Sequence, residues 1–164
     1  QTLLDLGDKA KLTDEILSQG FRLAAEAGRV DDVGWFVRNG ADIEAKDEND
    51  RTALMLAAKH GHTETVKALL QAKPNIEAKD QDGYTALTLA AKNDRKEIVQ
   101  ALIDAGANKD AIAAGGCTAL MLAATYDRAD TLQALLAADA DKEATNKHGN
   151  KYRHCISKSF SFSK

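Results

Sequence analysis

The chain has 164 residues, 44% of them hydrophobic and 29% charged, so it can fold as one domain or a short repeat array. Its net charge of −3 argues against a dedicated nucleic-acid-binding protein. No apolar run reaches the roughly 20 residues of a membrane span. The 30 alanines and the single proline predict closely packed helices. The two cysteines do not make a disulfide framework, which favours an intracellular location, cytoplasmic or nuclear.

The sequence repeats itself with a period of 33 residues. The tripeptide Thr-Ala-Leu occurs at 52–54, 85–87 and 118–120, and each copy leads into a leucine followed by an alanine pair. These leucines are Leu56, Leu89 and Leu122. We expect them to be buried in like surroundings, because they hold the same place in each unit.

In chain order, the first expected element is a helix that Thr13 caps and that runs into the first unit, with Gly20 as its weak point. Before it, Leu3, Leu4 and Leu6 predict a short packing segment. The first unit then follows over residues 20–49.

The second unit shows the pattern of the others. Thr52 can cap a helix over 52–59, and Gly61 can end it in the left-handed conformation. The rest of the unit is expected as a second helix (64–71), a turn (73–75), an extended stretch (76–79) and an exposed tip (80–83). One such unit cannot bury its apolar face alone, so the pattern predicts an all-α solenoid of stacked units.

These motifs resemble those of the ankyrin-repeat family over about residues 20–150. The matching residues are Gly83-Tyr84-Thr85-Ala86-Leu87, Gly61-His62 and Gly40-Ala41-Asp42. The chain departs from the family where the opening proline is alanine and where the opening histidine is Met55, Thr88 or Met121. The hydrogen bond between threonine and histidine that often ties the family's repeats together therefore cannot form.

The resemblance divides the chain into an N-terminal helical capping segment (1–19), four repeats (20–49, 50–82, 83–115 and 116–148) and a degenerate C-terminal repeat or tail (149–164). Residues 147–164 hold five Lys or Arg and no acidic residue. One interpretation is a partial repeat in which Tyr152, Ile156 and Phe160 form an apolar stripe. The other is a loosely held basic tail. In register, Arg153 takes the place of a buried leucine.

No pattern of catalytic residues is present, and no cofactor or metal is expected. His60-Gly61-His62 is the nearest approach to a metal pair, but the turn between two helices explains it better. Cys117 is expected as an inert surface cysteine, since no activating base is evident. Acidic residues between 42 and 50 lack the spacing of a calcium loop and are interpreted as solvated.

The resemblance implies that a partner docks in a concave groove formed by loop tips and first helices. The groove positions in this sequence are Arg51, Met55, Lys59, His60, Asp82, Tyr84, Thr88, Lys92, Asn93, Cys117, Met121, Thr125 and Tyr126. For the two methionines, filling gaps between first helices is an equally good interpretation. Trp35, which aligns with alanines in the other units, is expected to be partly buried in the core or to pack at the end of the array.

The leading functional hypothesis is a non-catalytic module that binds a protein partner with acidic and apolar residues. One alternative is a structural or self-associating fragment. Another is an inhibitor of an enzyme such as a kinase. A monomer is expected, although a poorly capped C-terminus would allow association end to end. Binding to nucleic acid through the basic tail is disfavoured, and no membrane contact is expected.

Overall fold

The computed structural model describes the backbone of residues 3–155 and the side chains of residues 13–155. Within that part it is all-helical and contains no strand. The α-helices are α1 (Leu3–Glu26), α2 (Val30–Arg38), α3 (Ala53–His60), α4 (Thr63–Gln71), α5 (Ala86–Lys92), α6 (Lys96–Asp104), α7 (Ala119–Thr125) and α8 (Ala129–Ala137). A 3-10 turn, η1 (Ala114–Gly116), precedes α7, and residues 152–155 make one further helical turn.

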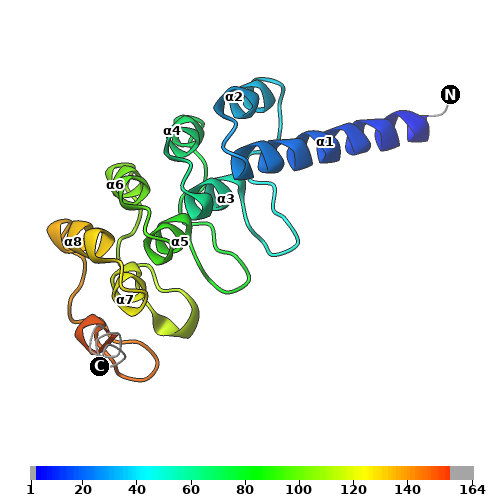
Figure 1. Cartoon of the computed structure of the whole chain (residues 1–164). Helices are drawn as coiled ribbons and strands as arrows, with labels where there is room; N and C mark the ends of the chain where they lie inside the picture. The colour runs from blue at the N-terminus through cyan, green and yellow to red at the C-terminus, as the bar shows by residue number, and fades with distance from the viewer. Residues whose placement is uncertain (1–2, 156–164) are drawn as a thin grey trace.

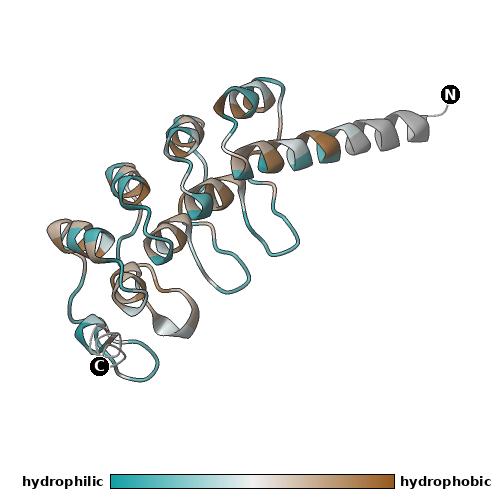
Figure 2. Ribbon diagram, in the orientation of Figure 1, coloured by the Kyte–Doolittle hydropathy of each residue, from teal (hydrophilic) through white to brown (hydrophobic). Residues whose placement is uncertain are grey.

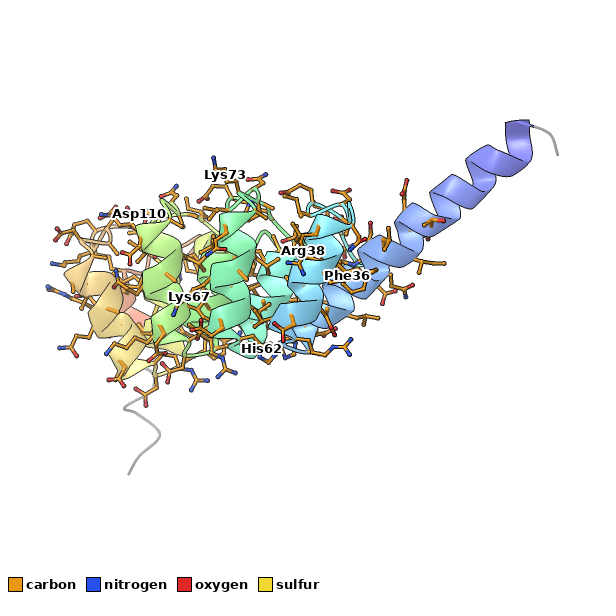
Figure 3. All side chains as sticks on the ribbon, turned by 90° about the horizontal axis from the view of Figure 1, so that it is seen from above. Phe36, Arg38, His62, Lys67, Lys73 and Asp110 are labelled. Atoms are coloured by element: carbon orange, nitrogen blue, oxygen red, sulfur yellow. The ribbon has the colours of Figure 1, made fainter. Side chains whose placement is uncertain are left out.

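The helices form an elongated stack of two layers, with a row of loops along one side (Figure 1). Helices α1, α3, α5 and α7 pack in sequence to make one layer, and α2, α4, α6 and α8 make the other. Seen from above, the outer helices lie side by side and α1 projects beyond them (Figure 3). The predicted solenoid is therefore confirmed.

The core lies between the two layers, where the apolar faces of the helices meet (Figure 2). Leu56, Leu89 and Leu122 are 3%, 6% and 5% exposed, as their common register predicted. Leu23 holds the same register in the first unit but is 53% exposed. The difference follows from position, because the first unit has no preceding unit to cover that side of α1.

The helix boundaries of the later units follow local signals. Thr52, Thr85 and Thr118 cap α3, α5 and α7 by accepting a hydrogen bond from a backbone N–H in the first turn. Gly61 ends α3 in the left-handed conformation with φ of 88°, as expected. In the next two units Asp94 and Asp127 adopt the same conformation, which a short polar side chain tolerates.

One expectation for the N-terminal region is wrong. Helix α1 starts at Leu3, so Thr13 lies within the helix rather than at its N-terminus. The helix continues through Gly20, which makes room for α2, because a Cβ at this position would lie 2.6 Å from Cζ of Phe36. The side chains of Leu3, Leu4 and Leu6 lie outside the described residues.

Acidic side chains connect each loop to the next. Glu44 accepts a hydrogen bond of 2.7 Å from the backbone N–H of Asn75, and Glu77 does the same for Asn108. Asp110 continues the series with Asp141 at 2.7 Å. Such charge-assisted bonds hold the loops at a fixed spacing. The acidic residue that recurs in each unit therefore has a structural role.

The fourth unit ends against a short turn. Tyr152 is buried against the array, and Arg153, which the register placed at a leucine position, is exposed instead. Lys151 forms an ion pair with Glu143, the acidic residue that has no later loop to bind among the described residues. The turn up to residue 155 packs on the fourth unit, whereas Ile156 and Phe160, which would complete the expected apolar stripe, lie outside the described residues.

One buried position differs between units and gives a stability prediction. The hydroxyl of Thr131 donates to Oδ1 of Asp94 at 2.9 Å, but the buried hydroxyl of Thr65 has no partner, because Gly28 stands where Asp94 would be. We expect Thr65→Val to raise the free energy of unfolding by about 1 kcal/mol, since it removes an unpaired buried hydroxyl. Thr131→Val should lower it by about 1 kcal/mol. Urea denaturation of both variants measures the difference, and equal effects would contradict this account.

Candidate functional site

The candidate site is the side of the stack formed by α1, α3, α5, α7 and the loops, which we call the inner face. Most of the predicted groove residues lie there with exposed or half-exposed side chains. They are Arg51, Lys59, His60, Asp82, Tyr84, Lys92, Asn93, Cys117, Thr125 and Tyr126. The short helices and the turns before and after them bring these residues to one face.

Three of the predicted groove residues are in the core instead. Met55 and Met121 are each 1% exposed, and Thr88 is fully buried. The methionines fill space between neighbouring first helices, which was the other interpretation of their position. Thr88 completes a capping box with Thr85, because its hydroxyl accepts a hydrogen bond of 2.8 Å from the backbone N–H of Thr85. None of the three can contact a partner directly.

Trp35 lies on α2 in the first unit and is 50% exposed. It was expected as part of the core margin or as packing at the end of the array, and half of its side chain is buried. Its ring makes an edge-to-face contact with Phe36, with the centroids 5.1 Å apart. The corresponding positions of the later units are alanines, which are also only partly buried.

The most distinctive cluster on the inner face joins two tyrosines and a lysine. The Lys92 ammonium at the end of α5 lies 4.8 Å from the ring centroid of Tyr84 and 5.4 Å from that of Tyr126. Both distances suit cation–π attraction. Burial opposes the charge of Lys92, but the interactions with the two tyrosines outweigh this effect and raise its pKa above the usual value. Lys92 is therefore protonated at neutral pH.

The ammonium of Lys92 has no acidic partner within the described side chains. The ion pairs found there all involve other residues, and no carboxylate lies within 4.0 Å of this nitrogen. Arg51, which occupies the place of Tyr84 one unit earlier, differs in this respect. Its Nε is 3.0 Å from Oδ2 of Asp47. Lys92 thus presents a positive charge that two aromatic rings hold in place.

The loop around Asp47 favours its charged form. Burial raises the pKa of Asp47, but hydrogen bonds from the backbone N–H groups of Arg51 and Asn49, together with the nearby Arg51 guanidinium, lower it by more. The net shift of this pKa is therefore downward. Asp80 and Asn146 accept the same pair of backbone hydrogen bonds in their loops. The third loop has Ala113 at this position and turns through Gly115 and Gly116 instead.

The histidine pair has a structural role. Nε2 of His62 lies 2.8 Å from the carbonyl oxygen of Glu26, at the end of the preceding first helix. His60 lies 3.4 Å from the carboxylate of Glu26, and the two imidazole rings stack. Among the described residues, no three His, Cys, Asp or Glu side chains gather in a way that could hold a metal ion. The pair therefore joins the first two units.

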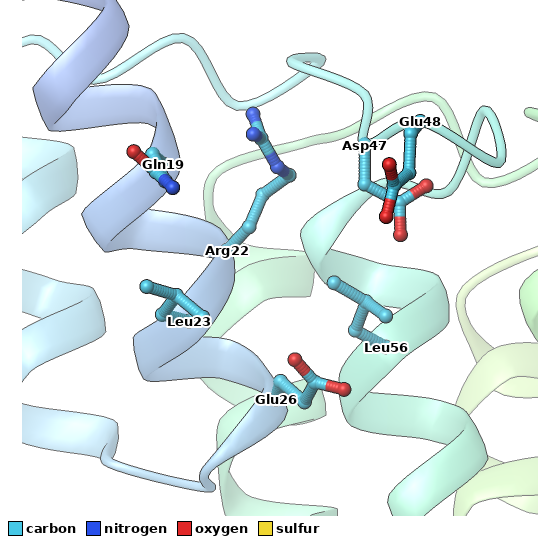
Figure 4. Close-up of a pocket in the computed structure, with 7 residues that line it drawn as sticks. All are labelled: Gln19, Arg22, Leu23, Glu26, Asp47, Glu48 and Leu56. Carbon is cyan, nitrogen blue, oxygen red and sulfur yellow. The ribbon is translucent and has the colours of Figure 1, made fainter.

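A pocket of about 380 Å³ opens between α1, α3 and the first loop (Figure 4). Leu23 on α1 and Leu56 on α3 line it, with Asp47 and Glu48 on the loop above. Arg22 and Gln19 complete the side formed by α1. The sequence analysis did not assign Leu23 to a site. The sequence could have indicated its exposure, because Leu23 has the register of the buried leucines but no preceding unit to cover it.

The charge of the loop tips changes along the inner face. The tips at 47–50 and 80–83 are acidic, with Asp, Glu, Asn, Asp in the first and Asp, Gln, Asp, Gly in the second. The tip at 113–116 is uncharged, and the tip at 146–149 carries Lys147 and His148. A partner that lies along this row meets negative charge near α1 and positive charge near the last unit.

These features define a helical repeat protein that exposes one rigid, mixed polar and aromatic face. The family model described as ankyrin repeats (3 copies) matches residues 21–113 and 77–146. The chain belongs to the ankyrin repeat family, whose domains generally serve as protein-interaction modules and are typically non-catalytic. A search of curated proteins found no match. Among the described helices, none combines the length and the apolar character that crossing a bilayer requires.

Proposed function

We propose that this protein binds a protein partner through its inner face, at a segment in which an acidic side chain stands beside apolar ones. The observation that carries the proposal is the Lys92 ammonium held between Tyr84 and Tyr126 without an acidic neighbour among the described residues. A partner carboxylate can pair with Lys92 while its apolar neighbours contact the tyrosine rings. Tyrosine is enriched at interfaces because it supplies contact area and a polar group together.

The stack suits this role because the site is formed before the partner arrives. Loops joined by charge-assisted hydrogen bonds and helices packed in two layers leave few side chains to be ordered on binding, which lowers its entropic cost. The pocket that Leu23 and Leu56 line offers a second contact point. Leu23, whose side chain is half exposed, can contact an apolar side chain of the partner.

The proposal predicts a specific loss of binding when the cluster is altered. Peptides selected from a display library on the intact chain should carry Asp or Glu beside apolar residues. Lys92→Met, Tyr84→Ala and Tyr126→Ala should each weaken binding of the selected peptide by about tenfold or more, because each removes one part of the contact. Isothermal titration calorimetry measures the affinities.

The controls separate binding from folding. Lys67→Met removes a lysine on the outer helix α4, which pairs only with Glu64 on the exposed surface, and it should leave peptide affinity unchanged. The Tyr126→Ala variant should keep the melting temperature within a few degrees, since Tyr126 is exposed. If the selected peptides lack acidic residues, or bind equally well without Lys92, the proposed site is wrong. Sedimentation at increasing concentration tests the expected monomer.

A further inference from the structure

The last unit contains a second pocket, of about 430 Å³, which shares Cys117 and Thr125 with the inner face. Its lining includes both cysteines of the chain, Cys117 and Cys155, together with His148, His154, Thr125, Asn146 and Asn150. The two cysteines are free and half-buried. They come from segments far apart in the sequence, so only the stacking of the last units brings both of them to one pocket.

The third loop and the C-terminal turn hold the two thiols in place. Cys117 follows η1, and the neighbouring Gly115 accepts a hydrogen bond of 3.0 Å from the backbone N–H of Lys147 in the next loop. Cys155 lies on the helical turn 152–155, where its Sγ is 3.7 Å from the carbonyl oxygen of Lys151. Burial of Tyr152 fixes this turn against the array.

The thiols are close enough to influence each other. Burial raises the pKa of Cys117, and the negative charge of a Cys155 thiolate raises it further, although Asn146 and Lys147 act in the opposite direction. Cys117 is therefore a poor first nucleophile at neutral pH. A thiol of this kind is better suited to attack a disulfide that already lies beside it.

A metal site does not account for the pocket, since no set of three or more ligands suited to a metal ion is found among the described residues. We propose that Cys117 and Cys155 are a modification site for small-molecule disulfides such as glutathione disulfide, which convert the pair to an intrachain disulfide. The new bond joins the third loop to the C-terminal turn.

The chemistry is two successive thiol–disulfide exchanges. The thiolate of Cys155 attacks one sulfur of glutathione disulfide, which breaks the S–S bond and releases one glutathione thiolate. The thiolate of Cys117 then attacks the Cys155 sulfur of the mixed disulfide and releases the second glutathione. Two cysteine thiols are oxidised, one glutathione disulfide is reduced to two glutathiones, and the two thiol protons leave to solvent or to the released thiolates.

The bond would affect the inner face. Cys117 holds the place that Tyr84 and Arg51 hold in the preceding units, and Thr125 lines the same pocket. An intrachain disulfide would fix the turn 152–155 beside this end of the inner face. Because it also closes a long loop, oxidation should raise the melting temperature by several degrees.

The test treats the whole chain with excess glutathione disulfide and measures intact mass without reduction. The wild-type protein is expected to lose two hydrogens and to retain no glutathione. Cys117→Ser should retain one glutathione, because the resolving thiol is missing. Cys155→Ser should acquire glutathione much more slowly, because Cys117 is the poorer first nucleophile. Serine is nearly isosteric, and melting curves under reducing conditions show whether each variant is folded.

Repeating the reaction in guanidinium chloride separates placement by the fold from simple proximity along the chain. The ratio of intrachain disulfide to mixed disulfide should be at least about tenfold higher for the folded protein, because the pocket raises the effective concentration of one thiol near the other. Wild-type protein that keeps glutathione on both cysteines, or that links two chains, would overturn the proposal. An equal ratio in the folded and unfolded chain would overturn it as well.

Discussion

Replacing Leu89 with alanine should lower the free energy of unfolding by about 3 kcal/mol. Leu89 lies on α5 in the middle of the stack and is 6% exposed. Helices α3 and α7 pack on the two sides of α5. Neither helix can move into the cavity left by the missing side chain without losing its own contacts, so the packing energy of Leu89 is lost almost in full. Urea denaturation followed by far-UV circular dichroism measures the change.

The matched control is Leu23→Ala, because Leu23 has the same register on α1 but is 53% exposed. This substitution should lower the free energy of unfolding by less than about 1 kcal/mol, since little apolar surface of Leu23 is buried. The comparison tests whether neighbouring units, and not the helix itself, bury this position. Similar losses for both variants would contradict the stacking explanation.

The second large effect is expected at Gly116, where substitution by alanine should lower the free energy of unfolding by about 3 kcal/mol. Gly116 has φ of 75°, and a Cβ there would lie 2.8 Å from the backbone nitrogen of Lys147. The left-handed conformation alone costs roughly 1–2 kcal/mol for a residue other than glycine. The contact would also push away the next loop, whose Lys147 N–H donates to Gly115.

Gly149→Ala isolates the conformational part of this cost. Gly149 has φ of 73°, but nothing lies within 4 Å of a Cβ at this position. The free energy of unfolding of Gly149→Ala should therefore fall by only roughly 1–2 kcal/mol. If chemical denaturation gives the same value for Gly116→Ala and Gly149→Ala, then the approach of the fourth loop does not constrain Gly116.

Much of the local structure could be predicted because it depends on residues a few positions apart. Thr52 caps α3 and Gly61 ends it through contacts within a single turn, and the 33-residue period fixes which leucines share an environment. The start of α1 could not be predicted in this way. Thr13 has the character of an N-cap, but the preceding residues continue the helix, and a capping residue is tolerated inside it.

The candidate site was predicted less well, because exposure depends on the neighbouring units. Met55 shows the error. It carries a side chain that is common at interfaces, but it lies on a face that the adjacent first helix covers. Tyr84, Lys92 and Tyr126 were each assigned to the inner face with Lys92 beside the aromatic residues, but the simultaneous contact of Lys92 with both rings comes from the structure.

The period, the helix pairs of each later unit, the caps and turns, and the solenoid class can all be read from the amino-acid sequence. These features follow from hydrogen bonds and apolar spacing within one unit. The exposure of each side chain, the position of Lys92 between two tyrosines, and the shared pocket of Cys117 and Cys155 emerge from the folded array. Each of these contacts joins different units or loops, so its geometry depends on how those units stack.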